Sequence, residues 1–411
     1  MKFLFVHQNF PGQYLHVARY LGTQNKHQVV FLTQREDANL PGVQKVIYKP
    51  GRKVDNHVHH YLRETEASVL NAQQVARAAL ELKQTGFMPD VMVGHNGWGE
   101  IWYLKEVFPD TPLIGYFEFF YRLQGTDVGF DPKENLIFDA GPRLRTKNIG
   151  NLLGLDAVDF GQCPTQWQRS LYPARYHSIL RIAHEGINTA AVAPNPKAGV
   201  KTPDGNILKV GDEIVTYVAR NLEPYRGFPS FMRSLPTILS NRPKAQIIIV
   251  GGDETSYGPS LPDGKTFRNQ MLEELGGSLD LSRVHFMGKV PYSIFLQVLQ
   301  ISRVHVYLTY PFVLSWSMLE AMSAGCLVVG SRTAPVEEVI RHRDNGLLVD
   351  FFDSVEIANT VIVALEQPEA FTEIRHNARQ TIIERYDLKR ICLPAQLGLL
   401  EDAMGRRISK E

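Results

Sequence analysis

Short apolar runs alternate with stretches of helical spacing along most of this chain. The runs end abruptly at polar residues, which is the pattern of a buried strand. Between most of them, apolar residues recur every three or four positions, most clearly over 60–84. Strands that alternate with helices are typical of βαβ units with a parallel sheet. The predicted strands of the first half are 2–6, 28–32, 91–94, 112–116 and 179–182.

The alternation stops at 193–213 and then begins again. This stretch contains three prolines and three glycines and has little periodicity, so it is the best linker candidate, with a tight turn at Asp204 and Gly205. We expect a first domain over 1–195 and a second over 206–387. After the linker, the predicted strands are 214–219, 246–250, 284–287, 304–308 and 326–330, and the predicted helices are 229–240, 291–301, 316–324 and three stretches from about 354 onward.

These two halves predict an α/β protein with two Rossmann-like, doubly wound parallel-sheet domains that face each other across a cleft. In open parallel sheets, ligands bind beyond the carboxyl ends of the strands. The first strand is followed by a loop with one glycine, the second strand has no acidic residue directly at its tip, and no P-loop sequence occurs. These features argue against a bound NAD, and no cofactor is expected.

Composition narrows the class of protein further. The 44 basic and 43 acidic residues nearly cancel, which argues against a dedicated nucleic-acid-binding protein. No apolar run reaches 18 residues, and the segment before His7 is too short for the apolar core of a signal peptide. Cys163, Cys326 and Cys392 lie far apart without metal-binding spacing, so we expect buried thiols in a reducing compartment, the cytoplasm.

A basic pair follows the first strand after the linker. Arg220 and Arg226 lie six positions apart on a predicted strand-to-helix loop, and two guanidinium groups beside a helix N-terminus suit a phosphate or diphosphate. The alternative is that both arginines are solvated loop residues. The next strand ends at Gly251 and Gly252, where the missing side chains would let a ligand approach the backbone.

A second loop leads into a helix that we expect to begin near Ser315. The backbone amides around Ser315 to Ser317 would lie in its first turn, where N–H groups lack helical partners. Glu320 stands on this helix among apolar residues. It is either a solvated surface residue or a group that accepts hydrogen bonds from ligand hydroxyls.

These two segments together resemble the retaining nucleotide-sugar glycosyltransferases of GT-B fold, family 4 type. The family sequence G-R-L-x-x-x-K-G corresponds to ARNL at 219–222 followed by Arg226 and Gly227. The second half of the family's E-G-F-G-L-x-x-L-E-A-M-A-x-G-x-P-V-V corresponds to LEAMSAGCLVV at 319–329. The resemblance covers nearly the whole chain.

The first half of the chain resembles the family more loosely. HEGIN at 184–188 is similar to the segment that closes the family's N-terminal domain, and GHNGWG at 94–99 is similar to its histidine motif. The resemblance implies that a final helix, about 388–411, packs back on the first domain. It also implies that His95 and the loop at Gly12 approach the donor sugar.

The resemblance implies a role for each matched residue. Arg220 and Arg226 would bind the donor diphosphate and stabilise it as the leaving group, which needs preorganised cationic or amide donors. With His95 they form the candidate catalytic set. Glu320 would accept from the ribose hydroxyls. The candidate donor-binding residues are Gly12, Gly252, Lys289, Val290, Phe312, Val313, Leu314, Ser315, Trp316 and Glu320.

Two positions depart from the family sequence. Its first glutamate corresponds to Phe312, whose ring either packs against C–H edges of the sugar or lies in the core, and its lysine corresponds to Arg226. No Asp-x-Asp occurs, so the usual carboxylate clamp for a metal-bound diphosphate is missing. The expected reaction is metal-independent. The resemblance implies retention, with attack from the face that the diphosphate leaves and with the leaving oxygen helping to deprotonate the acceptor.

The acceptor side has fewer signals. Glu118 follows a strand tip and could face the acceptor, which would be a sugar, a lipid-linked glycan or another small molecule. Arg143, Arg145 and Lys147 form either a weak contact to anionic lipid headgroups or a solvated face.

Several alternatives stay open from sequence. The cluster of His57, His59 and His60 is either a metal site or, as its polar surroundings favour, a solvated loop. The chain could also be an epimerase or phosphorylase on the same frame, or a nucleotide- or sugar-binding module without catalysis. Phe312 in place of a glutamate keeps the binding module open.

Overall fold

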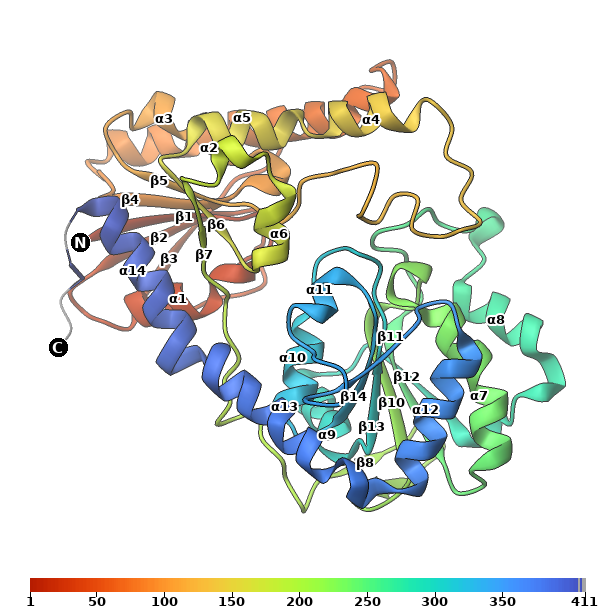
Figure 1. Ribbon diagram of the computed structural model, residues 1–411. Helices are drawn as coiled ribbons and strands as arrows, with labels where there is room; N and C mark the ends of the chain where they lie inside the picture. The colour runs from red at the N-terminus through yellow and green to blue at the C-terminus, as the bar shows by residue number, and fades with distance from the viewer. Residues whose placement is uncertain (406, 409–411) are drawn as a thin grey trace. The chain divides into compact units, whose positions relative to one another are not determined.

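The structure, a computed structural model, describes residues 1–405 and 407–408 and divides into two units (Figure 1). Unit 1 consists of Met1–Gly186 together with the residues from Leu388 onward, and unit 2 consists of Ile187–Asp387. The expected final helix over 388–411 falls in unit 1, but residues 406 and 409–411 lie outside the described residues. No helix in the described part of the chain is both long and apolar enough to span a bilayer.

The segment at 187–195 belongs to unit 2, whereas the sequence pattern places it in the first domain. The Ile187 amide donates to the Tyr386 carbonyl at 2.8 Å. The Arg379 guanidinium donates to the Val192 carbonyl at 3.1 Å. These bonds attach the segment to the last helix of unit 2.

Unit 1 is built on one sheet of parallel strands. In spatial order these are β3 (Val43–Ile47), β2 (Gln28–Thr33), β1 (Lys2–Val6), β4 (Val91–His95), β5 (Leu113–Tyr116), β6 (Phe160–Cys163) and β7 (Leu180–Ile182). The sequence pattern missed two of them. β3 is a half-exposed edge strand with polar residues at its middle, and β6 contains Gly161, where a Cβ would lie 2.4 Å from the Leu180 side chain.

Helices cover both faces of this sheet. Side chains of successive strand residues point to opposite faces, so β1, which is apolar after Lys2, supplies both cores. Leu4 and Val6 pack under α2 (Arg63–Gln84) and α3 (Leu104–Val107), while Phe3 and Phe5 pack under α1 (Leu15–Gly22) and α14 (Leu393–Met404). The other helices of unit 1 are α4 (Ala140–Lys147), α5 (Ile149–Ala157) and α6 (Gln166–Leu171).

Unit 2 repeats this plan with a second parallel sheet. In spatial order its strands are β12 (Val284–Gly288), β11 (Gln246–Gly252), β10 (Ile214–Asn221), β13 (Val304–Tyr307), β14 (Leu327–Ser331) and β15 (Leu347–Val349). Its helices are α7 (Phe228–Asn241), α8 (Phe267–Leu275), α9 (Tyr292–Ile301), α10 (Trp316–Ser323), α11 (Ala334–Glu337), α12 (Ser354–Glu366) and α13 (Thr372–Arg385).

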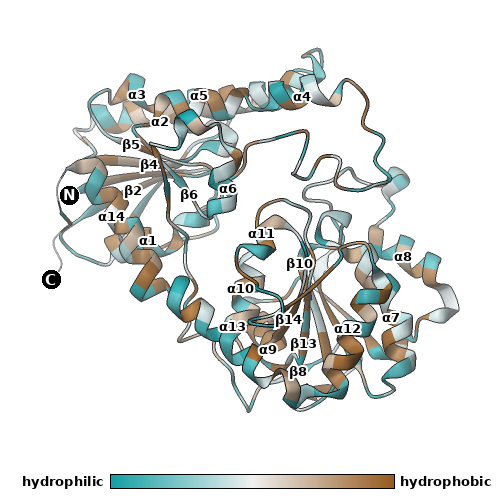
Figure 2. Cartoon of the chain, in the orientation of Figure 1, coloured by the Kyte–Doolittle hydropathy of each residue, from teal (hydrophilic) through white to brown (hydrophobic). Residues whose placement is uncertain are grey.

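The predicted linker is more ordered than its composition suggests. It contains the antiparallel pair β8 (Gly199–Lys201) and β9 (Ile207–Lys209), which is joined through the predicted turn, where Gly205 has a φ of 94°. Val200 and Leu208 of this hairpin are buried with residues of β10, β11 and α9 in one core cluster. The strands of both sheets are mainly apolar along their length (Figure 2). The predicted α/β fold with two Rossmann-like parallel-sheet domains is confirmed.

Candidate functional site

Both sheets reverse their strand order beside their first long strand. In unit 1 the chain runs from β1 outward to β3 and then returns to the other side of β1 at β4, and in unit 2 it runs from β10 to β12 and returns at β13. Such a reversal opens a crevice at the carboxyl ends of the two strands, where open parallel sheets bind ligands. His7 and His95 lie at this place in unit 1, and Arg220 lies at it in unit 2.

Arg220 lies on β10 itself and not on the loop predicted for it. The strand extends to Asn221 because a shift in register lets Asn221 pair with Gly252 of β11. The Arg220 side chain is exposed, and among the described residues none forms a hydrogen bond or an ion pair with it. Its donors are therefore available to an anion.

Arg226 has a different environment. It ends the short 3-10 helix η5 (Pro224–Arg226), is 7% exposed and donates through Nη1 to the Thr309 hydroxyl at 2.7 Å and the Val313 carbonyl at 3.0 Å. The ring of Tyr257 lies 5.1 Å from the guanidinium carbon. The two arginines of the predicted pair thus lie close in sequence but differ in exposure, and Arg226 holds the loop after β13.

Glu223 is a buried charge at this place that sequence reasoning missed. Its carboxylate is fully buried and accepts hydrogen bonds from the backbone amides of Ser256 at 3.2 Å, Tyr257 at 3.0 Å and Gly258 at 3.4 Å. The sequence shows a glutamate three residues before Arg226, which could have drawn attention to it. It does not show the partners of this glutamate, because they lie more than 30 residues away along the chain.

Phe312 belongs to an aromatic cluster at the rim of unit 2. Its ring is half-buried and lies 5.1 Å from the Tyr257 ring and 5.7 Å, edge to face, from the Tyr225 ring. Tyr225 stacks on Tyr310 at 4.7 Å. Phe312 is therefore neither in the central core nor isolated in solvent. It offers an apolar surface beside the Arg226 loop.

The amides expected to be unpaired at the start of α10 are partly satisfied, which corrects the sequence prediction. The Ser315 amide donates to the Tyr307 hydroxyl at 2.8 Å, and the Ser317 amide donates to the Ser315 hydroxyl at 3.3 Å because Ser315 caps the helix. Leu314 packs against the core cluster around α10, and the exposed fraction of Trp316 is 42%.

Glu320 is not a solvated surface residue. It lies on α10 and accepts a hydrogen bond from the Tyr292 hydroxyl at 2.6 Å. Burial raises the pKa of Glu320 to about 7, against the opposite effect of the Tyr292 hydrogen bond. The carboxyl therefore changes its charge near neutral pH and can accept hydrogen bonds.

The remaining predicted donor-binding residues of unit 2 gather where β10, β11 and β12 end. A Cβ on Gly252 would lie 2.5 Å from the Lys289 side chain and 2.6 Å from Asn221. Lys289 is exposed and forms an ion pair with Glu254, while the half-buried Val290 packs on the core. A larger residue at 252 would displace the ends of these two side chains.

His95 ends β4 in unit 1 and is buried among aromatic rings. It stacks on Tyr116 at 5.0 Å and lies 4.6 Å from the Trp98 ring. Burial lowers the pKa of His95 well below its usual range, so the ring is neutral. Its Nδ1 accepts the Gly97 amide at 2.9 Å, which places the proton on Nε2. That Nε2 forms no hydrogen bond with any described residue and lies 3.9 Å from the Glu118 carboxylate.

Gly12 is placed by the neighbouring His7. It has a φ of +53°, and a Cβ there would lie 2.5 Å from the His7 ring, so only glycine fits. Burial lowers the pKa of His7 to about 4, while its hydrogen bond with Gln13, at 2.7 Å, opposes the shift. The His7 and His95 rings lie 5.0 Å apart. The structure thus brings Gly12, His95 and Glu118 to one edge of unit 1.

A buried tyrosine–glutamate pair in unit 1 also escaped prediction. The Tyr116 hydroxyl donates to the Glu185 carboxylate at 2.6 Å, and His184 Nε2 lies 3.8 Å from the same carboxylate. HEGIN at 184–188 drew attention only by resemblance. Its partner Tyr116 lies on β5, and nothing in the sequence pattern relates that strand to the segment at 184–188.

The other two candidate groups lie largely at the surface. His57, His59 and His60 are at the surface, and no group of three or more metal-ligating side chains within residues 1–405 and 407–408 is placed to hold a metal ion. The solvated-loop interpretation therefore fits this cluster. Arg143 and Arg145 are exposed on α4, whereas Lys147, the third residue of the basic stripe, is half-buried, pairs with Glu64 at 3.4 Å and lies 4.2 Å from the centre of the Tyr121 ring.

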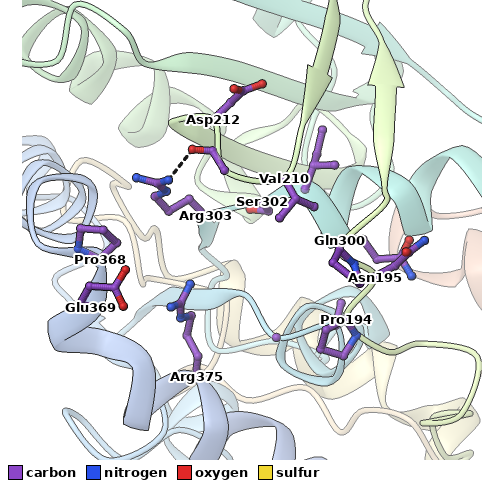
Figure 3. A pocket seen from close by; sticks show the side chains of 15 residues that line it. Pro194, Asn195, Val210, Asp212, Gln300, Ser302, Arg303, Pro368, Glu369 and Arg375 are labelled. Atoms are coloured by element: carbon purple, nitrogen blue, oxygen red, sulfur yellow. Dashed lines mark hydrogen bonds between the residues drawn. The ribbon is translucent and has the colours of Figure 1, made fainter.

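A cavity of about 330 Å³ lies at the amino ends of the unit 2 strands, where its lining residues precede β10, β13 and β14 (Figure 3). The Arg303 and Arg375 side chains face it, and Arg303 donates to the Gly211 carbonyl at 2.5 Å. Glu369 and the carboxyl ends of α9 and α10 offset these positive charges. The predicted site residues of unit 2 lie instead at the carboxyl ends of the strands, so this cavity is not part of the predicted site.

Comparison with known families places both units. Residues 25–192 match the family described as "Glycosyl transferase family 4 group", and residues 202–381 match "Glycosyl transferases group 1". Among curated proteins, the chain is 31% identical over 74 residues to N-acetyl-alpha-D-glucosaminyl L-malate synthase of Bacillus anthracis. It is 24% identical over 170 residues to an uncharacterized glycosyltransferase of Methanocaldococcus jannaschii. These matches span only 19% and 40% of the relatives' lengths, and 18% and 41% of this chain.

Solved structures are similar over nearly the whole chain. Sucrose-phosphate synthase from Thermosynechococcus elongatus superposes with a TM-score of 0.70 at 17% identity, covering 98% of this chain and 99% of that one. Anabaena HepE in complex with UDP-glucose superposes with a TM-score of 0.67 at 16% identity, covering 98% and 100%. At such identities the likeness shows the fold, which is that of the GT-B glycosyltransferases.

Proposed function

The chain belongs to the group 1 glycosyl transferases of the family 4 type, and from this premise we propose that it transfers a sugar from a nucleoside-diphosphate sugar to an acceptor. The observation that carries the proposal is Arg220, an exposed guanidinium without a protein partner among the described residues, at the switch point of the unit 2 sheet. The departing diphosphate develops negative charge, and a fixed cation at that place stabilises it.

The other residues complete this assignment. Glu320, with its Tyr292 partner, accepts hydrogen bonds from the ribose hydroxyls. The turn around Gly252 and Lys289 lies near the base, and Arg226 adds a second positive charge on the turn that follows β10. His95 donates its Nε2 proton to a substrate hydroxyl, and Glu118, 3.9 Å from that nitrogen, faces the acceptor.

We further propose that the transfer retains the configuration of the sugar and needs no metal. The assignments give the residues at the unit 2 switch point binding roles and no role as a nucleophile. The proposed reaction therefore forms no covalent sugar–enzyme intermediate, and the acceptor attacks from the face that the diphosphate leaves. The leaving oxygen takes the acceptor proton as the bond to the sugar breaks. Cationic donors perform the charge stabilisation that a metal–carboxylate clamp performs elsewhere.

A reducing location, such as the cytoplasm, is part of the proposal. Cys163, Cys326 and Cys392 are buried free thiols.

A weak contact with anionic membranes is a separate part of it. Arg143 and Arg145 stand close in sequence to exposed apolar residues, of which Ile137 is 67% and Phe138 is 92% exposed. Sedimentation with vesicles tests this contact. We expect the protein to sediment with anionic vesicles and not with zwitterionic ones. Equal recovery with both would contradict it.

The main experiment uses titration calorimetry with UDP, GDP and ADP, followed by turnover with the sugar nucleotides of the base that binds. UDP comes first because the HepE structures hold UDP or UDP-glucose. Transfer to an added sugar acceptor, full activity in EDTA and a product with the donor's anomeric configuration are expected.

Three other results would replace the proposal. Nucleotide release without any acceptor, with an epimerised sugar as the product, indicates an epimerase. A requirement for inorganic phosphate indicates a phosphorylase. Tight binding without donor hydrolysis or transfer indicates a binding module.

A further inference from the structure

Two buried groups of opposite charge lie at one turn of unit 2, and each bonds to a different loop. Glu223 immediately precedes η5, and Arg226 ends it. Glu223 contacts the loop after β11, and Arg226 contacts the loop after β13. The turn after β10 thereby joins the loops that follow both neighbouring strands.

The contact made by Glu223 is unusually complete. Three consecutive amides, those of Ser256, Tyr257 and Gly258, converge on its carboxylate at 3.0–3.4 Å. Such a concave run of N–H groups is a natural anion site, here filled by a side chain of the same unit. The Asn221 side-chain amide hydrogen-bonds the Ser256 hydroxyl at 2.7 Å and adds a second attachment.

This attachment decides where one aromatic ring lies. With its backbone held by Glu223, Tyr257 places its ring 5.1 Å from the Arg226 guanidinium carbon and 5.1 Å from the Phe312 ring. The ring covers the buried cation and meets the loop that Arg226 holds. A charge shielded from water in this way acts more strongly on a nearby anion.

We propose that Glu223 is a positioning residue of the nucleotide-sugar site, which fixes the turn Ser256–Gly258 so that Tyr257 closes the wall beside Arg226 and Phe312. This inference rests on the proposed function. Glu223 touches no substrate; it acts through Tyr257. A glutamine would replace it poorly, because its carbonyl oxygen lacks the charge that strengthens these bonds and its NH₂ group would face the Ser256 amide.

The test compares Glu223→Gln and Tyr257→Ala with the wild-type chain. Hydrogen exchange of the amides at 256–258 reports the attachment without requiring activity. In Glu223→Gln we expect these amides to exchange at least about ten times faster than in the wild-type chain, since their hydrogen bonds to a charged acceptor are lost. We expect both variants to raise the KM for the sugar nucleotide by about tenfold, with a smaller change in kcat. Tyr257→Ala removes no buried charge, so it keeps the test valid if Glu223→Gln folds poorly.

Glu274→Gln is the matched control, because it removes the same charge from α8, where Glu274 forms an ion pair with Arg233 of α7. It should change neither exchange at 256–258 nor the KM. Unchanged exchange in Glu223→Gln would overturn the attachment. Faster exchange with an unchanged KM in both variants would overturn the positioning role. Failure of the wild-type chain to bind any nucleoside diphosphate would instead refute the proposed function, and the exchange result would still stand.

Discussion

The switch points of the two sheets occupy equivalent positions but carry opposite chemistry. In unit 1, His7 and His95 are buried, and burial lowers the pKa of each so that the rings are neutral donors and acceptors. In unit 2, the side chains at the equivalent place, Arg220 and Arg226, are cationic guanidinium groups. The shared topology thus fixes where a ligand meets each sheet, and the side chains decide whether that place handles hydroxyls or anions.

The largest effect should come from the exposed cation. We expect Arg220→Ala to lower turnover by about a hundredfold or more and to weaken nucleoside-diphosphate binding, because one preorganised anion donor is lost. The melting temperature should be unchanged, since the side chain has no partner in the described part of the chain. Steady-state kinetics and calorimetry measure these effects.

Arg341→Ala is the control for that change. Its side chain is 79% exposed and pairs with a neighbouring surface acid, Asp344, in the same unit. Near-wild-type turnover and nucleotide affinity in Arg220→Ala would remove the anion role from unit 2 and with it the contrast between the units.

A smaller effect is expected in unit 1. His95→Phe keeps a flat ring among Trp98 and Tyr116 but removes the Nε2–H donor, so turnover should fall about tenfold, as for one lost hydrogen bond. Affinity for the bare nucleoside diphosphate should not change, because the ring is neutral. If His95→Phe weakens nucleotide binding as much as Arg220→Ala does, the assignment of hydroxyl contacts to unit 1 and anion contacts to unit 2 is wrong.

Glu320 adds a pH-dependent group to unit 2. With its pKa raised from 4.5 to about 7, the carboxyl loses most of its charge between about pH 8 and about pH 6, so lowering the pH over this range should weaken nucleotide binding about threefold to tenfold. The nucleotide's own phosphate titrates in the same range, and Glu320→Gln isolates its contribution. An identical pH profile in wild type and variant would exclude Glu320 from the nucleotide site.

The same shift has a stability consequence of known sign. Between pH 4.5 and about 7 the folded chain holds a proton on Glu320 that the unfolded chain has released. The free energy of unfolding therefore falls as the pH rises through this window. The slope of melting temperature against pH should be less negative there in Glu320→Gln.

The smallest effect is expected at Phe312. Phe312→Ala should raise the KM for the sugar nucleotide about threefold while leaving affinity for the bare diphosphate nearly unchanged, because an apolar ring face can pack only on the sugar. A core phenylalanine would instead cost about 3–5 kcal/mol of stability. Unfolding of the variant without a change in donor kinetics would remove Phe312 from the pocket.

The sequence predicted the architecture well because buried parallel strands are continuous apolar runs. It missed β3, whose polar residues face solvent at an edge, and β6, where Gly161 interrupts the apolar pattern to let Leu180 approach. It also missed β15, a buried apolar run of only three residues. It also read the hairpin β8–β9 as a linker, since proline and glycine conceal a short strand pair. Edges and hairpins depend on packing that local patterns do not contain.

The candidate site was predicted in part for the same reason. Charge and spacing were enough to single out Arg220, Arg226 and Glu320. The burial of Arg226 and the role of Glu223 were not visible, because their partners come from loops 33–87 residues away along the chain. Nor does the motif at His95 reveal that surrounding rings keep the histidine neutral.

The division of unit 1 into two stretches affects the order in which the chain can fold during synthesis. Ile187 and Asp387 form a β-bridge, so unit 2 enters and leaves at neighbouring points and leaves the ribosome as one continuous segment. Unit 1 begins first but is completed last, since α14 is made only after all of unit 2. Until then the sheet face that buries Phe5 and Tyr14 lacks Leu399 and Leu400. A nascent chain therefore carries an uncovered apolar surface for as long as the translation of unit 2 lasts, and that interval is when a chaperone would bind it.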